Sequence, residues 1–180
     1  MAFGSRYSRR SQPVTILRTT RWIRHVLRCI KAPTVAKGAQ EKAVGRTRGG
    51  LNTKIHAIVD GLGNPVAFYL SPGSDHDSKH AIELLDRMDI EGSNVLGDKA
   101  YDTDAILKYL EERGAIAVIP SKTNRLVQRE CDWWIYKERR LIECFFQRIK
   151  WFRRVATRYD KSDESFLGSV YLAATCILVK

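Results

Sequence analysis

The stretch Leu51–Leu70, LNTKIHAIVDGLGNPVAFYL, decides the fold. Residues 51–59 alternate apolar and polar side chains well enough to predict a strand, and residues 65–70 predict a second one. Between them, residues 60–64 have the sequence DGLGN, which is typical of a turn. We therefore expect an antiparallel hairpin in which Asp60 is a turn residue.

Helix and strand patterns alternate downstream of this hairpin. We expect a helix at 78–88 capped by Asp77 or Ser78, a short strand at 94–96, a helix at 104–113 ended by Gly114, a strand at 115–119, and helices at 133–154 and 164–179. The order predicts an α/β fold with a mixed sheet flanked by helices. A ribonuclease-H-like sheet has this order if its first strand lies upstream of residue 50.

The first 40 residues differ from the rest in charge. The net charge is +11, and residues 1–40 hold nine Lys or Arg and no Asp or Glu, with Glu41 the first carboxylate. We expect residues 1–40 to form a basic, loosely structured arm and residues 41–180 to form the ribonuclease-H-like domain. Within the arm, residues 21–30 permit a short helix or a poor strand, and residues 31–50 are expected to form a glycine-rich loop.

A basic arm before a near-neutral domain indicates a polyanionic partner, most often nucleic acid. A solvated leader and an organellar transit peptide remain alternatives. The composition, 44% hydrophobic and 28% charged, is ordinary for a soluble globular protein, and no apolar run approaches the roughly 18 residues that cross a bilayer. The four cysteines lack paired metal-type spacing, so we expect reduced thiols and a cytoplasmic location.

One side of the helix expected at 133–154 carries the sharpest chemical signal. Tyr136, Arg139, Glu143 and Lys150 share an arc about 60° wide, at about 100° per residue, along the border of the apolar face. Such a position leaves a carboxylate partly buried, where a metal can be held firmly. The alternative is an ordinary salt bridge between Arg139 and Glu143, which are four residues apart.

The spacing Y-x₂-R-x₃-E-x₆-K resembles the signature of the DDE transposases of insertion sequences. Further stretches resemble that family in the same order: VGRTRGGLNTKIHAIVD (44–60), LSPGSDHDS (70–78), VLGDKAYDTD (95–104), VIPSKTNR (118–125) and FRRVATRYDK (152–161). The resemblance covers about residues 30–180.

The resemblance implies phosphoryl transfer on DNA by a ribonuclease-H-like domain in which two Asp and one Glu hold two divalent cations. Hard oxygen ligands suit Mg²⁺ or Mn²⁺. Asp98 matches the family's second Asp and Glu143 its Glu, so both are expected to be catalytic metal ligands. A turn or helix-cap aspartate is the alternative for Asp98.

The same resemblance assigns Tyr136, Arg139 and Lys150 to gripping the transposon end, by stacking and by phosphate contacts. Arg46 and Arg48, in a glycine-flanked loop, are expected to add phosphate contacts, with a solvated basic loop as the alternative. The implied partners are insertion-sequence terminal repeats and target DNA, with a homodimer on paired ends. We expect Trp133 and Trp134 to pack rather than stack on bases.

The match fails at the first Asp, which the family carries on its opening strand. The corresponding window, residues 21–33, contains no Asp or Glu. We therefore expect a first strand that is poorly matched or missing and a transposase copy that is inactive or impaired. The charge break near residue 30 favours a frameshifted or truncated copy. A non-catalytic DNA-binding remnant that interferes with intact transposase, and a stand-alone nuclease, are the alternatives.

Overall fold

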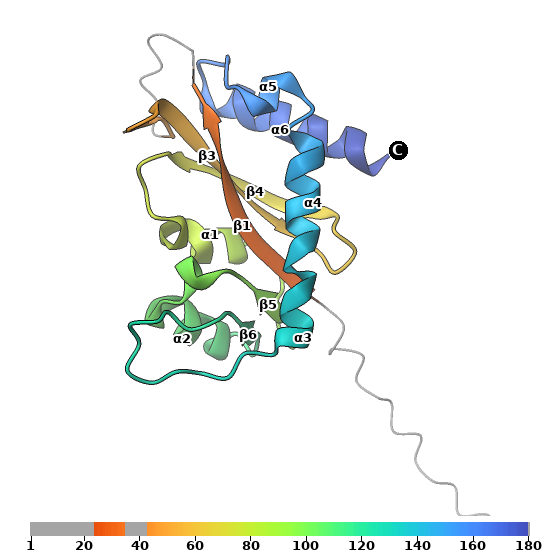
Figure 1. Cartoon of the computed structure of the whole chain (residues 1–180). Helices are drawn as coiled ribbons and strands as arrows, with labels where there is room; N and C mark the ends of the chain where they lie inside the picture. The colour runs from red at the N-terminus through yellow and green to blue at the C-terminus, as the bar shows by residue number, and fades with distance from the viewer. Residues whose placement is uncertain (1–23, 35–42, 180) are drawn as a thin grey trace, which may run out of the picture.

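A six-stranded mixed sheet forms the centre of the protein, in a computed structural model that describes residues 24–34 and 43–179 (Figure 1). Its strands are β1 (Arg24–Pro33), β2 (Gly45–Thr47), β3 (Gly50–Val59), β4 (Pro65–Pro72), β5 (Asn94–Leu96) and β6 (Ile116–Val118). Strands β1, β3 and β4 are antiparallel, and β5 and β6 continue the sheet parallel to β1. This is the ribonuclease-H-like arrangement that the sequence predicts.

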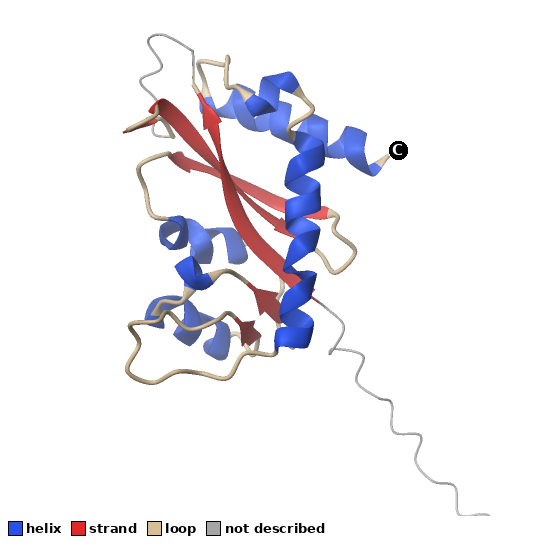
Figure 2. Ribbon diagram, viewed as in Figure 1, coloured by secondary structure: helices blue, strands red, loops and turns tan. Residues whose placement is uncertain are grey.

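Helices cover both faces of the sheet (Figure 2). The elements are η2 (Asp77–His80), α1 (Ala81–Leu85), η3 (Lys99–Tyr101), α2 (Asp104–Glu112), α3 (Trp133–Tyr136), η4 (Lys137–Arg139), α4 (Arg140–Ile149), α5 (Arg153–Ala156) and α6 (Asp163–Leu178). Among the described helices, none is both long enough and apolar enough to cross a membrane. The predicted mixed sheet flanked by helices is confirmed.

Two cores result, because successive strand residues point to opposite faces. Val26 of β1 joins the core beneath α4 and α6, together with Phe145 and Phe166. The next residue, Leu27, joins the core beneath α1 and α2, together with Leu84. All five of these apolar residues are at most 3% exposed. Strand β1 is therefore held from both sides.

The presence of β1 corrects two of our expectations. We expected the first strand to be poorly matched or missing and residues 1–40 to be loosely structured, but β1 pairs with β3 from Val26↔Val59 to Pro33↔Asn52. The physical reason is that Arg24 and Arg28 interrupt the apolar pattern of the strand without weakening it, since each forms an ion pair with an acid from another element. Residues 1–23 and 35–42 lie outside the described residues.

Most downstream elements lie where the sequence predicts them. The hairpin turn is built on Asp60, whose Oδ1 accepts from the backbone N–H groups of Leu62 at 2.8 Å and Asn64 at 2.9 Å. Gly114 has a positive φ of 65°, as a left-handed helix end requires. In place of the single helix predicted at 78–88, the structure has η2 followed by α1, and α1 ends at Leu85, three residues earlier than predicted.

The predicted long helix at 133–154 is wrong at its C-terminal end. Asp132 caps its start by accepting from the backbone N–H groups of Trp134 and Ile135, both at 3.0 Å. The helical run α3, η4 and α4 ends at Ile149, because Phe152 is extended, with φ −79° and ψ 103°. Phe152 packs against the α4–α6 core instead of continuing the helix.

Candidate active site

Two of the residues that we predicted to be functional, Glu143 and Lys150, lie around a side chain that we did not predict, Arg28 of β1. Arg28 lies on the same face of β1 as Val26, beneath α4. Its guanidinium donates a hydrogen bond to Oε1 of Glu143 and forms an ion pair with it. The two side chains are 34% and 37% exposed, so the pair lies at the edge of the core rather than within it.

Glu143 is held by a second guanidinium, that of Arg139, whose Nη1 lies 2.7 Å from the same Oε1. The i,i+4 salt bridge that we kept as an alternative is therefore present. Burial raises the pKa of Glu143, but Arg28 and Arg139 outweigh burial and hold this pKa below its ordinary value. Glu143 is thus an ionised carboxylate already neutralised by two arginines.

Asp98 follows β5, which pairs in parallel with β1 up to Val26↔Leu96. Arg28 lies two residues beyond Val26 within β1, whereas Asp98 lies two residues beyond Leu96, outside β5 and at the start of η3. Burial raises the pKa of Tyr101, Asp98 raises it further and Arg28 lowers it, so both charges act on one hydroxyl.

Asp98 also has the role that we kept as its alternative, that of a helix cap. Its Oδ1 accepts from the backbone N–H of Ala100 at 2.8 Å, at the start of η3. The second oxygen of a capping carboxylate remains available for another contact. The capping bond fixes the side chain near the end of β5, and it does not exclude a role in the site.

Tyr136 and Lys150 extend this cluster in opposite directions along the helical run. The ring of Tyr136 lies 5.7 Å from the guanidinium of Arg139. Burial raises the pKa of Tyr136, Arg139 lowers it and Asp98 raises it, which places Tyr136 within electrostatic reach of both. Lys150, at the end of α4, lines an open cavity of about 260 Å³ together with Arg28 and Glu143.

Arg46 and Arg48 are not part of this cluster. They lie on the hairpin between β2 and β3, and both are exposed. Gly50 has a φ of 94° at the end of the turn, a conformation that favours glycine. Neither arginine forms an ion pair with any described acid, in contrast to Arg28 and Arg139.

Two tryptophans, which we expected to pack rather than to stack on bases, lie at the protein surface. Trp133 is 61% exposed and Trp134 is 67% exposed, at the start of the helical run. The ring of Trp133 meets that of Tyr136 edge to face at 5.5 Å, and Arg24 lies over Trp134 at 5.8 Å. The run therefore begins with two exposed aromatic rings, because Ile135 and Tyr136 of α3 face the core whereas Trp133 and Trp134 do not.

Divalent cations do not fit the side chains present at this site. Two cations that activate a nucleophile and stabilise a leaving oxygen need several shared carboxylates. In residues 24–34 and 43–179, no three or more His, Cys, Asp and Glu side chains come together in a way that could hold a metal ion. Moreover, Glu143 is occupied by Arg28 and Arg139. That Asp98 and Glu143 hold Mg²⁺ or Mn²⁺ stays a prediction from the family resemblance.

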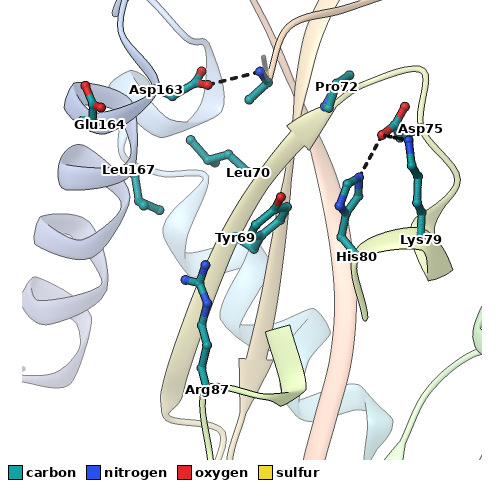
Figure 3. A pocket seen from close by; sticks show the side chains of 11 residues that line it. Tyr69, Leu70, Pro72, Asp75, Lys79, His80, Arg87, Asp163, Glu164 and Leu167 are labelled. Atoms are coloured by element: carbon teal, nitrogen blue, oxygen red, sulfur yellow. Dashed lines mark hydrogen bonds and ion pairs between the residues drawn. The ribbon is translucent and has the colours of Figure 1, made fainter. Parts of the chain in front are cut away.

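A second cavity, of about 560 Å³, lies along β4 and contains none of the predicted site residues (Figure 3). His80 stacks on Tyr69 at 5.0 Å between ring centroids and contacts Asp75, with 2.8 Å between Nε2 and the nearer carboxylate oxygen. The guanidinium carbon of Arg87 lies 5.3 Å from the centroid of the Tyr69 ring. Asp75 pairs with Lys79 and His80 at one end of the cavity. At the other end, Asp163 accepts from the backbone N–H of Ala43 and pairs with Arg158.

One family model matches most of this chain. The family model described as "Transposase DDE domain" matches residues 28–178. The match begins at Arg28 itself, within β1, and includes Asp98 and Glu143. The chain belongs to the DDE transposase family.

A relative of known sequence is a putative transposase for insertion sequence element IS6501 from Brucella ovis. It is 37% identical to this chain over 131 residues, which are 72% of this chain and the whole of that relative. Among solved structures, the Mos1 transposase in its paired-end complex with the left transposon end aligns with a TM-score of 0.38 and 13% identity. That alignment covers 85% of this chain and 52% of the Mos1 chain, so this chain spans about half of its length.

Proposed function

We propose that this chain binds DNA at insertion-sequence ends and is impaired in the metal-dependent strand cleavage and strand transfer of its family. The observation that carries the proposal is the ion pair between Arg28 and Glu143. With Arg139, this ion pair holds Glu143 between two guanidinium groups, where the carboxylate is not available to a metal ion.

The binding half of the proposal is supported by unneutralised charge. Arg46 and Arg48 are exposed and form no ion pair with a described acid, so both remain available for phosphate oxygens. Lys150 is also exposed at the end of α4. Arginine offers a planar fork that fits a phosphate, and lysine offers a point charge.

Exposed aromatic rings support contacts to bases at frayed or single-stranded ends. Trp133 and Trp134 lie beside Tyr136 at the start of the helical run. Stacking of a base on an aromatic side chain contributes about 1–3 kcal/mol. Tyr136 and Arg139 thus retain the DNA-contacting roles that the family resemblance implies, although Arg139 divides its charge between DNA and Glu143.

The impaired chemistry follows from the residues of β1. In-line attack on a phosphodiester needs charge neutralisation at both the attacking and the leaving oxygen. Arg28 supplies one fixed positive charge, and a guanidinium neither activates a water molecule nor exchanges ligands as a metal ion does. We expect no strand cleavage above background.

The experiment is a pair of assays on the full chain with a labelled duplex that carries the terminal repeats flanking its gene. Binding should be salt-dependent and unchanged by EDTA, and nicking should be absent with 10 mM Mg²⁺ or Mn²⁺, a concentration on the order of common assay conditions. Metal-dependent nicking that Asp98→Ala abolishes would refute the impaired chemistry. Equal binding to repeat and unrelated duplexes would refute recognition of the ends.

A second candidate function follows from the same ion pair. A chain that occupies ends without cutting them would interfere with an intact transposase of the same element. Adding this chain to an active relative should then lower strand transfer in proportion to end occupancy, and Arg46→Ala with Arg48→Ala should relieve that inhibition. Inhibition that persists in the double variant would exclude competition for DNA.

A further inference from the structure

We propose that the solvent-facing side of the helical run α3, η4 and α4 is a second DNA-binding surface, which holds the backbone of a duplex whatever its sequence. This outer stripe consists of Lys137, Arg140, Cys144, Arg148 and Trp151. The inference rests on the proposed DNA binding but not on recognition of insertion-sequence ends, and it concerns residues to which the family resemblance assigns no role.

The five side chains of the outer stripe share one side of the helical run. At about 100° per residue they fall within an arc about 80° wide, and all five are exposed. The buried residues Ile142, Phe145 and Ile149 lie on the other side, where α4 packs on β1 and β3 (Figure 1). Trp151 follows α4, and its backbone N–H donates to the carbonyl of Arg148 at 3.1 Å, which continues the last turn. The stripe therefore faces solvent from α4 to the turn that follows it.

The positive charge of the outer stripe is not neutralised within the part of the chain that the structure describes. There, Lys137, Arg140 and Arg148 form no ion pair with an acid, and the stripe itself contains no acid. The two glutamates of the same run, Glu138 and Glu143, pair with arginines of β1 instead. Three cations are thus available to an anionic partner.

A DNA duplex fits this row of cations because its own charge is continuous. Lys137 and Arg148 are eleven residues apart, which is about 16 Å along a helix. A duplex carries about one phosphate charge per 1.7 Å of its axis, so a row of this length meets phosphates in any register. Contacts to phosphates position a protein on the duplex but do not read its sequence. We therefore expect binding through the outer stripe to be independent of sequence.

Trp151 adds an aromatic ring at the end of the row. Its side chain is 84% exposed, more than that of either Trp133 or Trp134. A large apolar ring gains free energy when a partner removes it from water. The indole N–H is also a hydrogen-bond donor, which suits a phosphate oxygen, while the ring packs on a deoxyribose. One duplex along the stripe would thus satisfy both the cations and the ring.

Cys144 lies in the middle of the outer stripe and tests its occupancy in the unmodified full chain. Cys144 and Cys176 of α6 are both exposed free thiols, so Cys176 is a matched control. A duplex unrelated to the terminal repeats, at about ten times its Kd, should slow the reaction of Cys144 with a maleimide about tenfold. The reaction of Cys176 should not change, and mass spectrometry of the labelled peptides measures both.

The proposal is overturned if the duplex protects neither thiol or protects both equally. It is also overturned if raising the protein concentration without DNA protects Cys144, because the stripe would then bind a second copy of the chain.

A double variant provides an independent measurement. Arg140→Ala with Arg148→Ala should lower the slope of log K against log salt by about 1.8, equally for repeat and unrelated duplexes. Lys108→Ala with Arg113→Ala removes the same charge from α2 and the residue that follows it, and should leave the slope unchanged. An unaltered slope in the stripe variant would overturn the proposal. Because the same change is expected on both duplexes, failure of end recognition would leave these results as they are.

Discussion

Replacing both Arg46 and Arg48 with alanine should reduce the salt dependence of DNA binding. The two guanidinium groups are exposed at the tip of the β2–β3 hairpin and form no ion pair with a described acid. Each phosphate contact contributes about 0.9 to the slope of log K against log salt, so losing two contacts lowers the slope by about 1.8. When the salt concentration rises fourfold, from 50 to 200 mM, the binding constant of both proteins should fall. The factor by which it falls should be about 12 times smaller for the variant than for the wild type.

Fluorescence anisotropy with a labelled duplex at several NaCl concentrations measures this slope. The matched control is Lys108→Ala with Arg113→Ala, which removes the same charge from α2 and from the residue that follows it, at the end of the molecule opposite the hairpin (Figure 1). The control should leave the slope unchanged. A slope that is unaltered in the hairpin variant, or lowered equally in the control, would show that Arg46 and Arg48 do not contact phosphates.

Three further predictions follow from contacts of the site and its supporting core. Glu143→Gln should strengthen DNA binding and steepen its salt dependence, because it frees Arg28 and Arg139. The free energy of unfolding should fall by only about 1 kcal/mol, because the cluster is partly exposed. Fluorescence anisotropy measures the first effect and urea denaturation the second. Phe145→Ala should cost about 3–5 kcal/mol in urea denaturation, because this fully buried ring packs on Phe68 at 5.8 Å, whereas the exposed Leu172→Ala should cost less than about 0.5 kcal/mol. Burial lowers the pKa of His56 from 6.5 to about 4. As the pH drops from 6.5 to about 4, the unfolded chain therefore takes up a proton at His56 before the folded chain does, and the free energy of unfolding should fall. His56→Gln should flatten that fall, and an unchanged fall would point to other groups.

The elements that follow residue 50 could be predicted because their patterns are local. The hairpin around Asp60, the helix that ends before Gly114 and the helix that became α6 each carry their own periodicity and end signals. Strand β1 could not be predicted in the same way. Its two arginines look incompatible with a central strand until their partners Glu138 and Glu143 are known, more than 100 residues away in the chain.

The candidate site shows the same division between local and distant information. Helical spacing alone placed Tyr136, Arg139 and Glu143 on one side of a helix, and these residues do lie together. The contact of Arg28 with Glu143 depends on how β1 crosses beneath α4, which a sequence pattern does not encode. The one available signal was negative, because the window expected to supply an aspartate supplied arginines instead.

The two-sided packing of β1 makes the chemistry of position 28 sensitive to strand register. Because alternate residues enter different cores, a slip of one position against β3 and β5 would present Leu27 or Cys29 to Glu143 and would drive Arg28 beneath α1. An insertion or deletion of one residue near the start of β1 would therefore replace the guanidinium beside Glu143 with a thiol or an alkyl group. All the remaining side chains of the affected part of the strand would also change faces. Point substitutions are the only small genetic changes that alter residue 28 and leave both cores as they are.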